Sequence, residues 1–304
     1  MMRKQQTIRH EVEITGIGLH CGKKVNMRLK PAEENSGIQF LRTDIPHTEP
    51  IKLKPSNVIN TKLSTTIGEN GVIVKTVEHL VATLWAFKID NVLIEINNEE
   101  VPIMDGSASS FIYVIKNAGI IKQTKPKPTL ILKKAIYIKE NGKFVAMVPD
   151  RSFKINYAIK FDHPIIGRQK MNININEKTF TNEIGGARTF GFLKDVEYLQ
   201  SHNLALGGSL DNAIVVNEYK ILNEDGLRYK DEFVRHKILD AIGDISPLWY
   251  DIRGRFIAYR SGHTLNHKII KKLIENPDVW CLVNKTEKET SPARIVNIIE
   301  EFNF

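Results

Sequence analysis

Hydrophobic positions recur with the helical period in two places, and each time a strand-like alternation follows. In "KTVEHLVATLWAFKIDNVLIEIN" (75–97) the pattern predicts a helix, a short turn and a strand over "NVLIEIN". A second unit combines "FVRHKILDAIGD" (233–244) with a strand over "GRFIAYRSG" (254–262), and together the two units indicate a weak internal repeat. The apolar stripes of the two helices are Val77, Leu80, Val81 and Leu84, and Val234, Ile238, Ala241, Ile242 and Ile245.

Each predicted helix carries a histidine on the side away from its apolar stripe. At about 100° per residue, His79 falls roughly opposite the first stripe and His236 roughly opposite the second. If each stripe packs on its own sheet, both histidines turn outward. Two such units stacked helix to helix would therefore bring His79 and His236 face to face.

Most of the remaining apolar segments alternate like strands. A further helix is expected over "SSFIYVIKNAG" (109–119), with Asp105 or Ser107 as its cap and Gly119 at its end. Asn141-Gly142 has the residue types of a tight hairpin turn. These patterns predict an α+β fold class, with two sheets and helices against them. The strand-like segments, expected to be mostly antiparallel, are 11–20, 23–32, 36–43, 129–150 and 153–164.

The segment "KQTKPKPTL" (122–130) is the best candidate for a linker. Pro126 and Pro128 disfavour regular structure there, and lysines surround them. The chain is therefore expected to form two domains, 1–124 and 129–304.

Composition narrows the function classes without choosing one. The chain has 304 residues, 42% of them hydrophobic, and a net charge of +8, which suggests an anionic partner. A phosphate-bearing small molecule, nucleic acid and an anionic membrane surface all fit, but the lysines form no basic block and no nucleic-acid motif is present. Two cysteines and no apolar leader favour a reducing cytoplasm. No apolar run is long enough to span a bilayer, so membrane contact is at most peripheral.

Glycines in "TGIGLHCGKK" (15–24) do not form a dinucleotide fingerprint. Their spacing is Gly16-x-Gly18-x-x-x-Gly22, and a strand pattern follows where a helix is required. We interpret this segment as a turn between two strands.

Glu78-His79 and His236-x-x-x-Asp240 are the candidates for metal chemistry. Helical residues four apart lie about 6 Å from each other, so His236 and Asp240 are able to share an ion. With His79 they would leave an open fourth position, which catalytic zinc requires, and Glu78 would stand beside the ion as a base. Taken alone, a His and an Asp at this spacing are more often an ordinary surface pair than part of a metal site.

Other polar residues suit proton transfer and charge stabilisation. His263 in "SGHTLN" follows a strand end and would protonate a leaving group, while Asp244, one turn beyond Asp240, would orient it. Thr189 in "GGARTFGF" offers a hydroxyl to an oxyanion. Each also has an ordinary explanation as turn chemistry.

Taken together, "TGIGLHCGKKV", "TVEHL", "DGSAS", "ARTFGF", "LGGSLDNAIVV", "NEDGLRYKDEFVRHKILDAIGD" and "SGHTLN" resemble the UDP-3-O-acyl-N-acetylglucosamine deacetylase family along essentially the whole chain. The resemblance implies a zinc amidase that releases acetate from UDP-3-O-acyl-GlcNAc in the committed step of lipid A biosynthesis. It implies zinc on His79, His236 and Asp240, with Fe²⁺ as an alternative ion in the cell. We also expect a cytoplasmic monomer that binds no nucleic acid.

The resemblance assigns the remaining roles too. Catalysis would use Glu78 as base, His263 steadied by Asp244 as acid, and Thr189 at the oxyanion. Two similar domains would pack their helices together around the site, and the second would carry a βαβ insertion near 190–216 as an acyl passage. Substrate contacts would be Leu19, Lys143, Phe161, Phe190, Lys237 and Arg260; the passage would involve Val196, Ala205, Gly208, Ser209 and Val215, with Leu193, Leu199, Leu204 and Leu206 as further apolar candidates.

Three alternatives remain at this point: a related metal amidase for another sugar, a catalytically dead scaffold, and a basic nucleic-acid-binding protein. The intact set of candidate catalytic residues argues against the scaffold. The absence of a basic patch with interleaved aromatic residues argues against nucleic acid.

Overall fold

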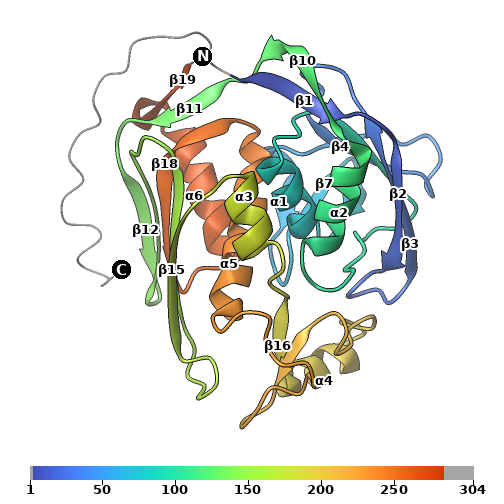
Figure 1. Cartoon of the computed structure of the whole chain (residues 1–304), viewed down its shortest axis with the longest axis vertical. Coiled ribbons are helices and arrows are strands. Elements are labelled where there is room, and N and C mark those ends of the chain that lie inside the picture. The colour runs from blue at the N-terminus through green and yellow to red at the C-terminus, as the bar shows by residue number, and fades with distance from the viewer. Residues whose placement is uncertain (1–2, 284–304) are drawn as a thin grey trace.

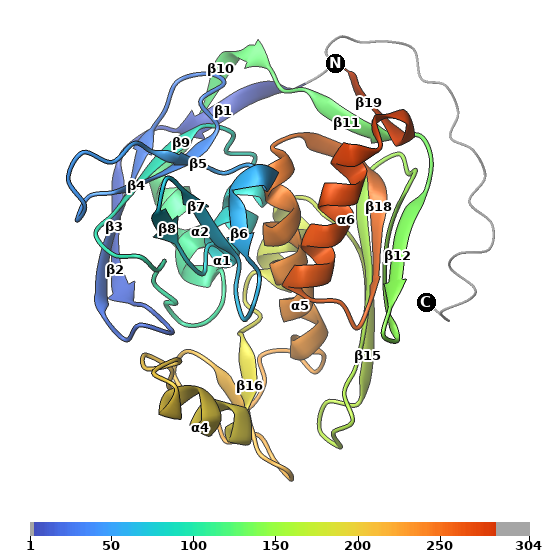
Figure 2. The same ribbon diagram turned by 180° about the vertical axis from the view of Figure 1, so that it is seen from behind.

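The computed structural model describes residues 3–283 and places two β-sheets on the outside with helices between them (Figures 1 and 2). The first sheet has the order β2-β3-β9-β4-β5, and helices α1 and α2 cover its inner face. A small sheet, β6-β7-β8, adjoins it. The elements of this half of the molecule are β2 (Val12–Ile17), β3 (Lys24–Pro31), β4 (Ile38–Arg42), β5 (Ile51–Lys52), η1 (Pro55–Asn57), β6 (Val58–Asn60), β7 (Thr66–Glu69), β8 (Val72–Val74), α1 (Glu78–Ala86), β9 (Val92–Ile96) and α2 (Ser109–Ala118).

The second sheet lies on the opposite side of the molecule, and α5 and α6 cover its inner face (Figure 2). Strand β18 is its centre, because it pairs with β11, β13 and β14. The elements are β11 (Thr129–Leu132), β12 (Ile136–Glu140), β13 (Lys143–Val148), β14 (Phe153–Lys160), β15 (Arg168–Asn174), α3 (Glu177–Thr179), η2 (Phe180–Ile184), α5 (Glu232–Ile245), η3 (Ser246–Leu248), β18 (Asp251–Tyr259), α6 (His263–Glu275), η4 (Pro277–Val279) and β19 (Trp280–Val283).

Helices α1 and α5 pack against each other at the middle of the molecule. Every residue of α1 is buried, because the helix is enclosed by its own sheet on one side and by α5 on the other. The predicted α+β class with helices packed between two sheets is thus confirmed. Both helix–strand units of the sequence repeat are present, as α1–β9 and α5–β18.

The predicted linker is wrong for most of its length. Residues 120–126 form strand β10 (Ile120–Pro126), which pairs antiparallel with β1 (Lys4–Ile8) in a ribbon at the top of the molecule in Figures 1 and 2. Pro126 is compatible with a strand here because it is the last residue of an edge strand, where no ladder hydrogen bond needs its missing N–H. The domain boundary itself stays a prediction, and residues 284–304 of the expected second domain lie outside the described residues.

A small βαβ unit projects from the second half of the molecule toward the bottom of Figure 1. Strands β16 (Phe190–Phe192) and β17 (Ile214–Val216) are parallel, and α4 (Leu193–Ser201) connects them. No residue of α4 is fully buried. We call residues 190–216 the insertion.

Several local predictions can be compared directly with the backbone. Asn141 and Gly142 form the β12–β13 turn with φ of 50° and 69°, and the glycine-rich segment is a turn in which the Gly18 N–H donates to the Lys23 carbonyl at 3.0 Å. The expected cap of α2 is wrong, because its N-cap residue is Ala108.

The sheets are mostly antiparallel, as the sequence predicts, and parallel pairs are the exceptions. Strand β4 runs parallel to β9, and β14 runs parallel to β18. Strand β4 does not pair with its neighbour in sequence, β3, because β9 lies between them. The alternation of apolar residues reports which face is buried and leaves the strand partner undetermined.

Candidate active site

The closest approach of α1 and α5 brings the two halves of the site together. A Cβ atom added to Gly243 of α5 would lie 2.4 Å from the Glu78 carbonyl oxygen at the start of α1. A residue without a side chain is therefore required at this crossing. His79 and His236 meet across the two helices, as the positions of the apolar stripes predict, with ring centroids 4.9 Å apart and the ring planes at 87°.

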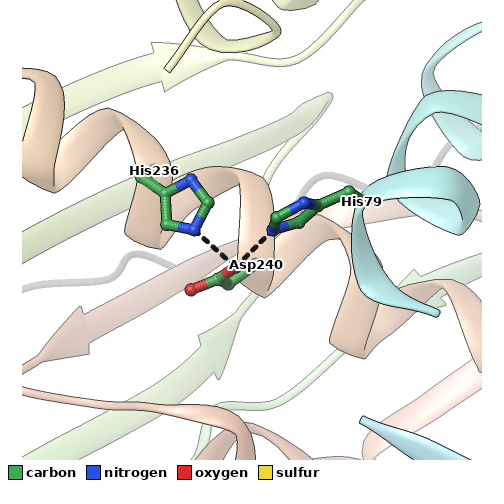
Figure 3. Close-up of side chains that lie close together, drawn as sticks. All are labelled: His79, His236 and Asp240. Carbon is green, nitrogen blue, oxygen red and sulfur yellow. Dashed lines mark ion pairs between the residues drawn. The ribbon is translucent and has the colours of Figure 1, made fainter. Parts of the chain in front are cut away.

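His79, His236 and Asp240 converge from α1 and α5, as Figure 3 shows. Asp240 Oδ1 lies 3.5 Å from His79 Nε2 and 3.3 Å from His236 Nε2. All three residues are buried, and among residues 3–283 they form the one group of His, Cys, Asp or Glu residues whose geometry suits a metal ion.

The protonation of this group fits a divalent cation. His236 Nδ1 lies 3.1 Å from the Ala187 carbonyl, which fixes the hydrogen on Nδ1 and leaves the Nε2 lone pair directed at Asp240 and His79. Burial lowers the pKa of His236 to about 3, so its imidazole is neutral. Burial alone would raise the pKa of Asp240, but the Lys237 ammonium, which donates to its Oδ2, outweighs this and holds the pKa well below the usual range. Two histidines and one carboxylate are a donor set of a catalytic zinc site.

Glu78 and His263 border this group. Glu78 is buried and accepts a hydrogen bond from the Thr65 N–H at 3.0 Å. Burial raises the pKa of Glu78, which brings the carboxylate closer to the basicity that proton abstraction needs. His263 Nε2 lies 3.9 Å from Glu78 Oε1, and both residues line the same cavity, so one substrate atom in that cavity is able to contact both groups.

Asp244 accepts a hydrogen bond from His263 on the side of the ring away from Glu78. His263 Nδ1 is 2.9 Å from Asp244 Oδ1, and the same carboxylate accepts hydrogen bonds from the Thr65 hydroxyl at 2.6 Å and Asn266 Nδ2 at 2.8 Å. Burial alone would lower the pKa of His263, but Asp244 outweighs it and raises this pKa to about 9. The imidazolium is therefore the form present at neutral pH, with Nε2 as its free donor.

A cavity of about 280 Å³ opens onto these residues. Five of the remaining predicted site residues line it: Leu19, Phe161, Thr189, Phe190 and Lys237. Lys237 Nζ also donates to Asp240 Oδ2 at 2.5 Å. The further lining residues, which sequence reasoning did not assign to the site, are His20, Leu63, Ser64, Thr76, Ile103, Gly191, Phe192 and Asp195.

Lys143 and Arg260 do not line this cavity. Both are exposed at the end of the second sheet, where β13 pairs with β18. The predicted passage residues do not line it either. They lie in the insertion, where Ala205 and Val215 are buried, Val196 and Gly208 are half-buried and Ser209 is exposed.

Thr65 and Asn266 are the functional residues that sequence reasoning missed. Thr65 joins Glu78 and Asp244 through one backbone and one side-chain hydrogen bond. Its segment, "LSTTIGE" (63–69), carries no periodic or motif signal. Asn266 lies in "SGHTLN", one turn after His263 on α6, so its proximity to the same face was accessible from helical spacing.

The buried donor set, the carboxylate beside it and the charged histidine opposite define a metal-dependent hydrolase. A family model described as UDP-3-O-acyl N-acetylglycosamine deacetylase matches residues 5–275. Proteins named UDP-3-O-acyl-N-acetylglucosamine deacetylase match over nearly the whole chain. The one from Haemophilus influenzae (strain PittEE) is 47% identical over 97% of this chain and 98% of its own, and the one from Histophilus somni (strain 129Pt) is 47% identical over 99% and 100%. That of a Nitratiruptor species is 49% identical over 90% and 91%. The chain belongs to the UDP-3-O-acyl-N-acetylglucosamine deacetylase family, as its motifs predict.

Proposed function

We propose that this chain hydrolyses the N-acetyl group of UDP-3-O-acyl-N-acetylglucosamine, giving acetate and a free glucosamine amine. The observation that carries the proposal is the convergence of His79, His236 and Asp240 with Glu78 and His263 on one cavity, in a chain of this family. Water cleaves the amide C–N bond, so the reaction needs a base, an acid and a centre of positive charge near the carbonyl oxygen.

Zinc is the proposed ion, on His79 Nε2, His236 Nε2 and an Asp240 carboxylate oxygen. When bound there it would lower the pKa of water and polarise the amide carbonyl. The neutral state of His236 and the ionised state of Asp240 support this assignment, because both groups offer lone pairs at neutral pH.

The chain's own residues would move the protons. Glu78 takes a proton from the attacking water, and its buried position strengthens it as a base. His263, protonated at neutral pH, donates from Nε2 to the departing amine, while Asp244 keeps its Nδ1 hydrogen bonded. Thr189, on the same cavity, would donate its hydroxyl to the developing oxyanion.

Substrate recognition is proposed for residues farther from the metal group. Phe161 and Phe190, whose ring centroids are 5.8 Å apart, offer an apolar wall beside Lys237. Lys143 and Arg260 would bind the diphosphate, and the insertion would hold the acyl chain. No helix among residues 3–283 is long and apolar enough to cross a membrane. The monomeric state, peripheral membrane contact and cytoplasmic location stay predictions from the sequence.

The proposal is tested by measuring acetate released from UDP-3-O-acyl-N-acetylglucosamine before and after treatment with a chelator. We expect acetate release to stop on chelation and to return with Zn²⁺. Unchanged release after verified metal removal would overturn the proposal.

A further inference from the structure

A buried carboxylate holds the turn that joins β2 and β3, residues 18–22. Glu100 has no exposed surface. Its Oε1 accepts the His20 N–H at 2.9 Å and the Thr76 hydroxyl at 3.1 Å, and its Oε2 accepts the Cys21 N–H at 2.8 Å. A buried carboxylate is costly unless its lone pairs are satisfied, so these donors and Glu100 fix each other's positions.

The Leu19–His20 and His20–Cys21 peptide groups of this turn also form hydrogen bonds with the insertion. The Leu19 carbonyl accepts the Gly207 N–H at 3.0 Å, and the His20 carbonyl accepts the Leu206 N–H at 3.3 Å. In a trans peptide the C=O of one residue and the N–H of the next point in opposite directions. Each peptide unit therefore bonds Glu100 at one end and the insertion at the other, and such chains of hydrogen bonds strengthen one another.

The two backbones meet closely at this junction. A Cβ atom added to Gly207 would lie 2.3 Å from the Gly18 carbonyl oxygen. The neighbouring Ala205 has a φ of 53°, a left-handed conformation that a non-glycine residue keeps only where surrounding contacts impose it. The contact with residues 18–22 is one such constraint on the insertion.

The junction also borders the cavity. Leu19 and His20 line it, and a Cβ atom on Gly208 would lie 3.7 Å from Leu19 Cδ1. We infer that Glu100 is a positioning residue, which fixes the insertion against the turn 18–22 and thereby sets the affinity for the acyl chain of the substrate. This inference rests on the proposed function, because it assigns the acyl chain to the insertion.

Glu100→Gln tests the inference, since the amide keeps the size of the side chain but turns an NH₂ group toward one of the N–H donors. We expect kcat/KM for the long-acyl substrate to fall by about tenfold or more, mainly through KM, as for the loss of a charged buried hydrogen-bond acceptor. With UDP-N-acetylglucosamine, which has no acyl chain, kcat/KM should stay within about twofold, because that substrate makes no use of the insertion. Glu99→Gln is the matched control: Glu99 is adjacent, half-buried and paired with Lys75 at 2.6 Å, and its variant should behave as the wild type with both substrates.

Hydrogen exchange at the Leu206 and Gly207 amides gives a readout that needs no substrate. We expect about tenfold faster exchange in Glu100→Gln than in Glu99→Gln, in proportion to the weakened hydrogen bonds. Equal exchange in the two variants, or an equal loss of kcat/KM with both substrates, would overturn the inference. If the wild type deacetylates neither substrate, the proposed function fails while the exchange measurement still tests the junction. If Glu100→Gln does not fold, Glu100→Asp keeps the charge but withdraws it from the turn, and it is tested in the same two ways.

Discussion

His263 lies between two carboxylates of different roles: its Nδ1 is 2.9 Å from Asp244 Oδ1, and its Nε2 is 3.9 Å from Glu78 Oε1. The first contact raises the pKa of His263 to about 9 against the opposing effect of burial. The second places an acid and a base side by side on the cavity, where one substrate atom is able to contact both. The pH dependence of activity follows from this arrangement.

We predict a bell-shaped pH profile of kcat/KM. A group that acts while protonated works below its pKa, so activity is lost as the pH rises through about 9, the pKa of His263. Glu78 acts while ionised, so activity is also lost as the pH falls through its raised pKa. Asp244→Asn removes the charge that favours the imidazolium, and the alkaline limb should therefore move to lower pH. Asp195→Asn, another carboxylate on the cavity, should leave that limb in place; an unmoved limb in Asp244→Asn contradicts the acid role of His263.

Loss of a ligand should remove the metal. We expect His79→Ala and Asp240→Ala to bind zinc at least about tenfold more weakly, because two donors remain where catalytic sites use three. Zinc content after dialysis, measured by mass spectrometry, checks this. His10→Ala replaces an exposed histidine and should retain the full metal content. Undiminished zinc in Asp240→Ala would show that the ion binds elsewhere.

Gly243 should be sensitive to the smallest substitution. In Gly243→Ala the new methyl group would meet the α1 backbone at Glu78, and separating the helices should lower the free energy of unfolding by about 1–3 kcal/mol. The zinc affinity should fall as well, because the ligands come from both helices. In Gly262→Ala nothing lies within 4 Å of the added Cβ, and we expect a change within about 0.5 kcal/mol. Denaturant unfolding of the two variants tests the crossing, and equal stabilities would contradict it.

Much of the site follows from sequence periodicity, since the two apolar stripes predict that His79 and His236 face each other. The spacing of the apolar residues identifies the buried face of each helix, and both helices form where this spacing predicts them. The strand at 120–126 was not predicted, because its prolines and lysines are typical of a linker. It is a strand because it pairs with β1. Thr65 did not follow either. Its contacts with Glu78 and Asp244 arise from a loop whose position only the tertiary structure determines.

A buried ion pair joins the segment before β9 in the first sheet to the segment before β11 in the second. Lys127 Nζ lies 2.7 Å from Asp90 Oδ1, and both side chains are 3% exposed. Asp90→Ala leaves the Lys127 charge buried without this partner, so we expect the free energy of unfolding to fall by about 3–5 kcal/mol. Asp278→Ala breaks the exposed pair with Lys134 and should cost about 1 kcal/mol or less. Comparable losses in the two variants would contradict a structural role for the buried pair.

The central claim is that Glu78 transfers protons, whereas His79, His236 and Asp240 bind the metal. The most direct test is the rate at which the Glu78→Gln variant releases acetate from the substrate, compared with the wild type at equal zinc content. Glu78 lies beside the ligands on α1, so this variant should hold as much zinc as the wild type. Its kcat should be lower by about 10²–10⁴-fold, the contribution of a general base. Acetate release at the wild-type rate with zinc bound would contradict the assignment of Glu78 as the base, and with it the proposed mechanism.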